Sequence, residues 1–258
     1  MKTLPIFLLA LSLLSGGAHA QILISNASPV ILNFNNLNTN FGGTYNSSGG
    51  STVFPITGAA ALAVYSGGPN SALNSNFADY APGGVYSNTS TYNTSNSMRA
   101  LQDGSTSDLA LGLKTSSTQN FTLRMQNSTA DSVSVFTLSY AIEQYSQGGS
   151  ATPFTLSYSL NGTSFITTNQ TGGAAVTAVT GTDGNLASVL STTRSATITE
   201  TIAPSGEIYF RWTYTHISGT SPHLGLDDVS VNPTFVPEAS ITSFFGFLGA
   251  LSLLHRRR

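Results

Sequence analysis

The adjacent pair Asp227-Asp228 is the first place where two carboxylates of this sequence could do chemistry together. Two carboxyl groups hydrolyse a glycosidic bond when they lie roughly 5 to 9.5 Å apart in a cleft, but successive strand residues point to opposite faces. The pair could also supply one or two of the roughly six to eight oxygens that Ca²⁺ takes. Because no D-x-D-x-D spacing accompanies it, we favour carboxylates that accept backbone N–H bonds at a β-bulge. We therefore expect no cofactor, with a structural calcium ion as the open alternative.

Serine and histidine could form a hydrolase triad, since serine is abundant and both His216 and His223 are present. The sequence contains no G-x-S-x-G nucleophile elbow. It also contains no H-E-x-x-H, no P-loop and no G-x-G-x-x-G. His216 is typical of a strand end and His223 of a loop. We predict that the protein is not an enzyme, with a hydrolase as the distant alternative.

Exposed aromatic rings could bind sugars, because sugar rings stack on aromatic faces while Asn and Gln side chains bond to the hydroxyls. An Asn/Ser/Gly-rich region carries five tyrosines that could form such a platform: Tyr45, Tyr65, Tyr80, Tyr86 and Tyr92. Tyrosine is also ordinary in the loops of secreted β proteins. The only tryptophan, Trp212, alternates in phase with Phe210, so we expect it in the core.

The composition favours a β-rich extracellular body. Of the 258 residues, 40% are hydrophobic and only 8% are charged, so the polar surface must consist of Ser, Thr, Asn and Gln. Helical bundles usually place Lys and Glu there. A formal net charge of −2 without clustered basic residues in the body excludes a nucleic-acid binder. The absence of cysteine excludes disulfide scaffolds, zinc–thiolate sites and cysteine nucleophiles.

Four segments alternate apolar and polar residues with a period of two, which predicts half-buried antiparallel strands. They are FTLRMQN from Phe121, VFTLSYAIEQ from Val135, FTLSYSL from Phe154 and EIYFRWTYTHI from Glu207. The apolar side of each should face a core and the hydroxyl-bearing side should face solvent. No body segment shows a sustained 3.6-residue period between helix caps. The sequence therefore predicts an all-β, antiparallel body.

Two local signals indicate how the chain turns and shifts. Asn161-Gly162 follows one alternating run, and both residues accept a positive φ, which predicts a hairpin turn. In HLGLDDVSVNP the apolar residues change register between Leu226 and Val229. Because a one-residue slip moves side chains to the other face, a β-bulge at Asp227-Asp228 would let Leu224 and Leu226 face the core together with Val229 and Val231.

We expect a single domain over 21–231. Residues 33–108 are rich in Gly, Ser, Asn and Tyr, which is typical of long loops between short strands. Hydrophobic stretches within them indicate that they belong to the same domain. Pro233 and Pro237 oppose regular structure, so we expect a linker at 232–236 and a separate tail at 237–258.

The N-terminus MKTLPIFLLALSLLSGGAHA has the organisation of an export signal. A basic Lys2 precedes an apolar run, and the small residues Ala18 and Ala20 flank His19 in the A-x-A pattern of a signal-peptidase site. We expect signal peptidase to cleave after Ala20, which makes 1–20 a signal peptide.

The C-terminal segment VPEASITSFFGFLGALSLLHRRR combines Pro237-Glu238, an apolar stretch and a basic end. As a helix, the stretch 241–254 would rise by about 21 Å, which is less than the ~30 Å hydrocarbon core of a bilayer. The positive-inside rule would hold three residues on the cytoplasmic side: Arg256, Arg257 and Arg258. The segment therefore predicts a short hydrophobic helix at the limit of a membrane span, and a plain membrane anchor is the open alternative.

These three parts, in this order, resemble the PEP-CTERM sorting signal of Gram-negative bacteria over about 23 residues. The resemblance implies recognition near Pro237-Glu238 by exosortase, a membrane transpeptidase-like enzyme. The family's usual second proline is Ala239 here, which would loosen that recognition. The resemblance also implies transient anchoring in the inner membrane, followed by transfer to the cell surface or the extracellular space.

The stretch from Asn120 to Val231, with RWTY and LDDVSV, resembles the jelly-roll-like β-sandwich modules that many PEP-CTERM proteins carry. The resemblance implies two antiparallel sheets face to face, with the N- and C-terminal strands adjacent. Our leading hypothesis is an exported, non-enzymatic surface or extracellular-matrix protein with a structural or adhesive role in exopolysaccharide. The alternative is a carbohydrate-binding module on the same scaffold.

Overall fold

The computed structural model describes residues 22–32, 34–35, 52–56, 60–66, 85–89, 97–104, 107–114 and 118–236. Every regular element within these ranges is a β-strand, which confirms the all-β prediction. No helix in the described part of the chain is long and apolar enough to cross a bilayer. The expected signal peptide at 1–20 and the expected tail at 237–258 lie outside the described residues.

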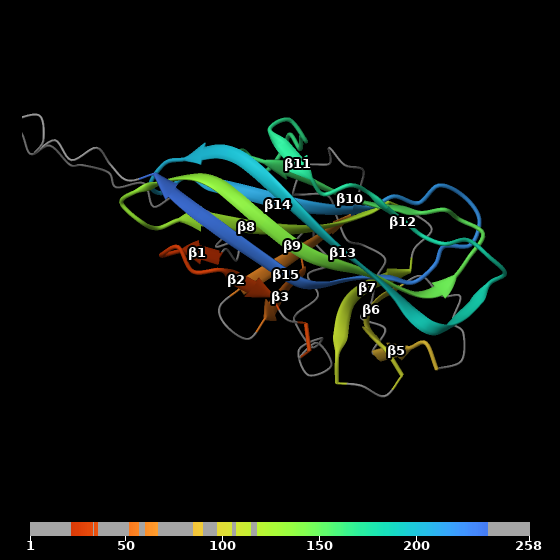
Figure 1. Cartoon of the computed structure of the whole chain (residues 1–258). Coiled ribbons are helices and arrows are strands. Elements are labelled where there is room, and N and C mark those ends of the chain that lie inside the picture. Colours follow the sequence, from red (N-terminus) through yellow and green to blue (C-terminus); the bar gives the residue numbers. More distant parts are fainter. Residues whose placement is uncertain are drawn as a thin grey trace, which may run out of the picture.

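The described strands form two sheets, which we call sheet A and sheet B (Figure 1). Sheet A has the order β12 (Val176–Thr177), β10 (Pro153–Ser159), β14 (Glu207–Tyr214), β8 (Gln119–Asn127), β4 (Ala60–Ser66) and β3 (Thr52–Ile56), with β1 (Ile22–Ile24) beside β8. Sheet B has the order β11 (Gln170–Gly172), β13 (Gly184–Ile202), β9 (Ser132–Gln147), β15 (Leu224–Val236), β7 (Leu109–Lys114), β6 (Ser97–Gln102) and β5 (Val85–Ser87), with β2 (Val30–Leu32) beside β15.

Long antiparallel strands dominate both sheets. In sheet B, β9 lies between β13 and β15 along nearly its whole length, as the three adjacent ribbons in Figure 1 show. Among the described pairs, β1–β8 and β5–β6 are parallel. The early strand β2 pairs with the last strand β15 from Val229↔Leu32 to Val231↔Val30. The expectation that the N- and C-terminal strands lie side by side is therefore confirmed.

The two sheets pack face to face over one hydrophobic core. Phe136 of β9 meets Phe210 of β14 edge to face, with ring centroids 5.5 Å apart. Tyr140 of β9 meets Trp212 of β14 in the same way at 5.7 Å. Since β9 belongs to sheet B and β14 to sheet A, these rings join the two layers of a β-sandwich. The prediction that Trp212 lies in the core is confirmed.

The outer face of sheet A differs from the prediction. The polar side of β14 should have faced solvent, but Tyr209, Arg211 and Thr213 are buried. The guanidinium carbon of Arg211 lies 3.4 Å from the centroid of the Phe165 ring, and its Nε donates to Thr122 Oγ1 at 3.0 Å. A residue that follows β10 therefore covers this face, a contact that strand alternation cannot reveal.

The turn after β10 is confirmed at Asn161-Gly162. Gly162 has φ of 71°, and Asn161 Oδ1 accepts hydrogen bonds from the N–H groups of Thr163 and Ser164, both at 2.9 Å. An antiparallel bridge between Tyr158 and Ile166 closes the turn. Leu160, which continued the apolar alternation, is exposed rather than in the core, because it lies after the end of β10.

The predicted bulge in β15 is also confirmed. Asp227 pairs with Ala141 and Ser230 pairs with Ser139, so two residues of β15 stand opposite one residue of β9. Asp228 takes up the shift with φ of 48°. As a result, Leu226 and Val229 both lie in the core.

The expected linker at 232–236 is wrong, because these residues continue β15. They pair with β9 from Asn232↔Thr137 to Val236↔Ser132. The described pairing with β2 ends at Val231, so from there on β15 has a described neighbour only on its β9 side. A strand tolerates a proline at such an edge position, which explains why Pro233 does not end β15.

Candidate functional site

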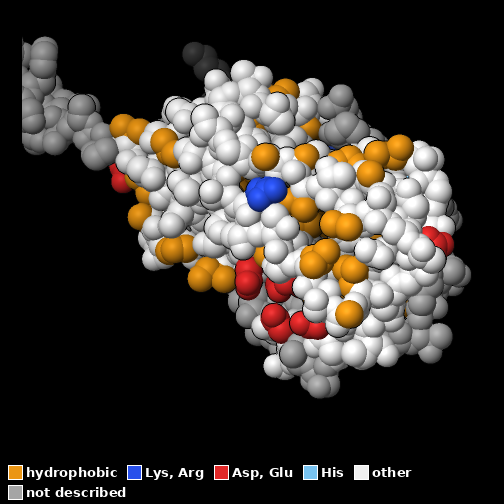
Figure 2. Space-filling model, turned by 45° about the vertical axis from the view of Figure 1, so that its right-hand side comes forward, with side chains coloured by type: hydrophobic (Ala, Val, Ile, Leu, Met, Phe, Trp, Pro, Cys, Tyr) orange, Lys and Arg blue, Asp and Glu red, His pale blue; other side chains and the backbone are white. Residues whose placement is uncertain are grey.

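Sheet B brings together four carboxylates that are scattered along the sequence, which we call the acidic cluster: Asp108, Glu143, Asp227 and Asp228. Glu143 of β9 pairs with Gly225 of β15, which lies two residues before Asp227 in the same strand. Asp108 directly precedes β7, the other neighbour of β15. Figure 2 shows acidic side chains gathered in a patch on one face of the molecule. Glu143 lies far from Asp227 in the sequence, and the pairing of β9 with β15 places it here.

Burial favours the protonated form of two members of this cluster, Asp227 and Glu143. Asp227 is only 3% exposed, and burial raises its pKa from 3.8 to about 7, with further increases from Asp228, Glu143 and Asp108. Burial likewise raises the pKa of Glu143, although the hydroxyl of Tyr145 donates to its carboxylate. Near neutral pH, Asp227 is therefore partly protonated.

The structure shows the expected backbone hydrogen bond at one carboxylate of the pair, that of Asp227. Asp227 Oδ1 accepts a hydrogen bond from the backbone N–H of Asp228 at 2.7 Å, within the bulge. In the described part of the chain, no three His, Cys, Asp or Glu side chains are arranged to hold a metal ion. The chemistry that the described geometry supports at this place is the uptake and release of a proton.

The two histidines lie in different settings. His223 is fully buried, with Nδ1 2.9 Å from Ser146 Oγ and its ring stacked on Tyr86 at 4.0 Å between centroids. His216 Nδ1 lies 2.7 Å from Ser221 Oγ. The loop interpretation of His223 missed its burial, because the ring packs between β5 and β9.

The tyrosine platform is not assembled in the described residues. Tyr86 is buried, and its hydroxyl donates to Asn185 Oδ1. Its ring is covered by His223 and does not lie on the surface. Only the backbone of Tyr65 is described, in β4. The other three candidates lie outside the described residues: Tyr45, Tyr80 and Tyr92.

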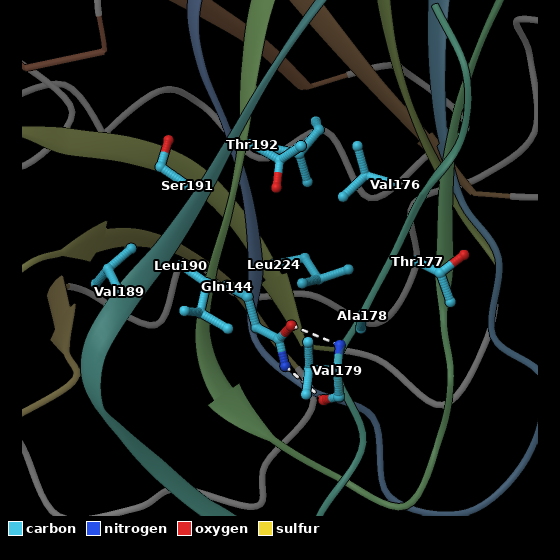
Figure 3. Close-up of a pocket in the computed structure, with 11 residues that line it drawn as sticks. Gln144, Val176, Thr177, Ala178, Val179, Val189, Leu190, Ser191, Thr192 and Leu224 are labelled. Atoms are coloured by element: carbon cyan, nitrogen blue, oxygen red, sulfur yellow. Dashed lines mark hydrogen bonds between the residues drawn. The ribbon is translucent and has the colours of Figure 1, made fainter.

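A cavity of about 480 Å³ lies at one edge of the sandwich, between β12 of sheet A and β13 of sheet B (Figure 3). We call it the edge cavity. Val176–Val179 form one wall and Val189–Thr192 form the other, as Figure 3 shows. Ile142, Gln144 and Leu224 of sheet B complete the lining. The lining contains no charged and no aromatic side chain, so the cavity suits an uncharged group.

Gln144 fixes the wall that follows β12. Its Oε1 accepts the N–H of Val179 and its Nε2 donates to the carbonyl of Val179, both at 2.8 Å. Nε2 also donates to the carbonyl of Ser146 at 2.9 Å. This amide therefore links β9 to the backbone of Val179 through two hydrogen bonds, which fix the position of this wall of the cavity.

The opposite wall is shaped by an irregularity in β13. Asn185 pairs with Ser146 and Leu190 pairs with Gln144, so residues 186–189 stand opposite Tyr145 alone. The extra residues bulge out of the ladder. This bulge places Val189 and Leu190 at the rim of the cavity.

No family model and no curated protein matches the chain. The chain is similar to the carbohydrate-binding module TmCBM61 in complex with β-1,4-galactotriose, with a TM-score of 0.29 and 12% identity over 49% of this chain and 72% of that chain. At this level of identity, neither this likeness nor the two that follow assign a family to the chain. The chain is also similar to the K3 cleaved adhesin domain of Lys-gingipain from Porphyromonas gingivalis w83, with a TM-score of 0.32 and 9% identity over 48% of this chain and 74% of that chain. For CBM28, a carbohydrate-binding module specific for non-crystalline cellulose, the TM-score is 0.32 and the identity is 7%, over 66% of this chain and 88% of that chain.

Proposed function

We propose that this chain is an exported, non-enzymatic surface or extracellular-matrix protein, sorted through its PEP-CTERM-like tail and structural or adhesive within exopolysaccharide. The observation that carries this proposal is the pair of terminal signals, the A-x-A pattern that ends at Ala20 and the Pro237-Glu238 motif that precedes an apolar stretch and Arg256–Arg258. The described sandwich starts with β1 at Ile22 and its last strand ends at Val236. Cleavage after Ala20 and near Pro237-Glu238 would therefore leave every described strand pairing intact.

The architecture supports the finer assignment to a jelly-roll-like module. Two mainly antiparallel sheets face each other, and β2 lies beside β15. The chain has no cysteine, so an exported form depends on its packed core for stability. A core shared by both sheets, with rings such as Phe136 and Trp212, supplies that stability.

Sorting is tested by following the full chain in a Gram-negative host that carries an exosortase. We expect the wild-type protein at the cell surface or in the medium. The double variant Pro237→Ala/Glu238→Ala should accumulate in the inner membrane, because the processing motif is lost. Ser240→Ala, beside the motif, is the matched control and should be sorted like the wild type. Normal release of the double variant would overturn the proposal.

A carbohydrate-binding role on the same scaffold is the competing proposal. The edge cavity supports it, because neutral hydroxyl groups of Thr177 and Thr192 accompany its aliphatic walls, and such groups bond to sugar hydroxyls. The mature secreted protein should then be retained on a polysaccharide column, including one made from the host's own exopolysaccharide. Absence of retention on every polysaccharide would remove this alternative.

A further inference from the structure

Among the described strands, a stretch of the β13 edge of sheet B beside the edge cavity has no partner. β11 covers β13 from Gln170↔Ile198 to Gly172↔Ala196, and the N–H of Gly173 still donates to the carbonyl of Ser195 at 2.7 Å. The chain then leaves sheet B and joins sheet A, where Val176 pairs with Phe154. No described strand pairs with Leu190–Thr193 on the side away from β9. The carbonyl of Thr193 already accepts a hydrogen bond from Arg194 Nη1 at 3.3 Å. The N–H of Thr193 and the backbone groups of Ser191, which point the same way as the Ser195 carbonyl bound by Gly173, can receive another strand.

The open edge and the cavity form one feature. Leu190 and Thr192 line the edge cavity, while Ser191 stands opposite Glu143 on the other side of sheet B. A strand laid along Leu190–Thr193 would therefore send alternate side chains into the cavity and toward the acidic cluster. We call Leu190–Thr193 together with the edge cavity the edge groove.

Steric limits at both ends decide what kind of partner fits the edge groove. At one end, Arg194 Nε donates to the carbonyl of Ala174 at 3.2 Å, where the chain crosses between the sheets. At the other end, residues 186–189 bulge out of β13. A folded sheet edge would meet both obstacles, whereas a single extended segment can lie between them.

Charge and polarity define the side chains of that segment. The cavity lining has no charged residue, so an inward-facing side chain must be uncharged, and aliphatic walls favour an aliphatic one. On the other side of the strands lie the carboxylates of Glu143 and the rest of the acidic cluster. Neighbouring strands are about 4.8 Å apart, so an added strand would lie about 9.6 Å from β9, and an extended Lys side chain would have to pass over Ser191 to reach the carboxylate of Glu143.

We propose that the edge groove binds an extended peptide segment by strand addition, with aliphatic side chains directed into the edge cavity and Lys or Arg side chains between them. Backbone hydrogen bonds to Leu190–Thr193 give the affinity, and the cavity and the acidic cluster give the specificity. This interaction does not depend on the tail, and it assigns a peptide occupant to the edge cavity that the competing carbohydrate proposal also uses, so it goes beyond the proposed function.

The probe is a labelled, end-blocked heptapeptide of sequence Thr-Val-Lys-Val-Lys-Val-Thr, titrated into the mature protein and followed by fluorescence anisotropy. We expect saturable binding at concentrations below about 1 mM. A peptide with Asp in place of both Lys residues should bind at least about tenfold more weakly. A peptide with Pro at the central position should also lose binding, because it lacks one backbone donor.

Two protein variants locate the site. Leu190→Lys places a charge at the rim of the cavity and should weaken binding at least about tenfold. Leu160→Lys is the matched control, because Leu160 is 46% exposed and Leu190 is 41% exposed, and it should bind like the wild type. Equal binding by wild type and Leu190→Lys would overturn the proposal.

Hydrogen exchange identifies the mode of binding. Strand addition should slow amide exchange within Leu190–Thr193 when the peptide is bound. Absence of saturable binding up to about 1 mM, or binding without slower exchange in this segment, would overturn the proposal.

Discussion

Asp227 and Asp228 share one hydrogen bond, from the backbone N–H of Asp228 to the carboxylate of Asp227, inside the bulge of β15. The bulge turns Val229 back into the core, so Leu226 and Val229 are both buried. The same bulge places the buried Asp227 carboxylate among three others. Fold register and electrostatics are therefore coupled at this one position, and each can be tested separately.

The pH dependence of stability should report on Asp227. Its pKa is raised by burial to about 7 in the folded protein, above the ordinary 3.8. Between these values the folded state binds more protons than the unfolded state, so the contribution of Asp227 to the free energy of unfolding falls as pH rises. Asp227→Asn, which stays neutral, should gain at least about 1 kcal/mol relative to wild type between pH 5 and pH 8.

Thermal melting of both proteins across this pH range measures the effect. Asp183→Asn, at an exposed position before β13, is the control and should keep a constant offset from wild type. A constant offset for Asp227→Asn as well would show that Asp227 does not hold its proton in the folded state.

Backbone strain should decide which residues are accepted at position 228. Asp228 has φ of 48°, a conformation that Gly and Asn adopt easily and β-branched residues resist. We expect Asp228→Gly and Asp228→Asn to stay within a few tenths of a kcal/mol of wild type, and Asp228→Val to lose roughly 1–2 kcal/mol. Urea denaturation measures this, with Ser230→Val in the same strand as the control. Equal stability of Asp228→Gly and Asp228→Val would show that the positive φ at position 228 carries no backbone strain.

The Gln144 amide should control the wall of the edge cavity. Gln144→Met keeps the length of the side chain but loses its hydrogen bonds, and Gln144→Asn keeps the amide but shortens its reach. In the wild type the N–H of Val179 donates to Oε1 of Gln144. Both variants should expose this N–H, and its hydrogen exchange should become at least about tenfold faster. Unchanged exchange in both variants would show that Gln144 does not hold this wall.

The pair Arg211–Phe165 should stabilise the covered outer face of sheet A. The guanidinium lies 3.4 Å from the ring centroid in a fully buried position, and a desolvated cation–π contact contributes about 0.5–2 kcal/mol. A double-mutant cycle with Phe165→Leu and Arg211→Met, measured by urea denaturation, should give a coupling energy in this range. A coupling energy of zero would contradict the contact.

Strand alternation predicted the core of this protein well. Segments such as FTLRMQN and EIYFRWTYTHI place Phe121 and Trp212 in the core, because side-chain direction in a strand follows from sequence position alone. The bulge at Asp227-Asp228 was also predictable, since the apolar register visibly changes there. Local sequence carries this kind of information.

Contacts between distant segments were not predictable in the same way. Glu143 joins Asp227 only through the pairing of β9 with β15. Arg211 is covered only because Phe165, on another segment, folds over it. The edge cavity depends on where the chain crosses from β11 to β12. Each of these features follows from tertiary arrangement, and no residue pattern marks it in advance.

The most direct test of the proposed sorting is the intact mass of the mature protein isolated from a host with an exosortase. The proposal predicts a chain that begins at Gln21 and ends near Pro237-Glu238, so that every described strand from Ile22 to Val236 is retained. An intact C-terminus through Arg258 would contradict it.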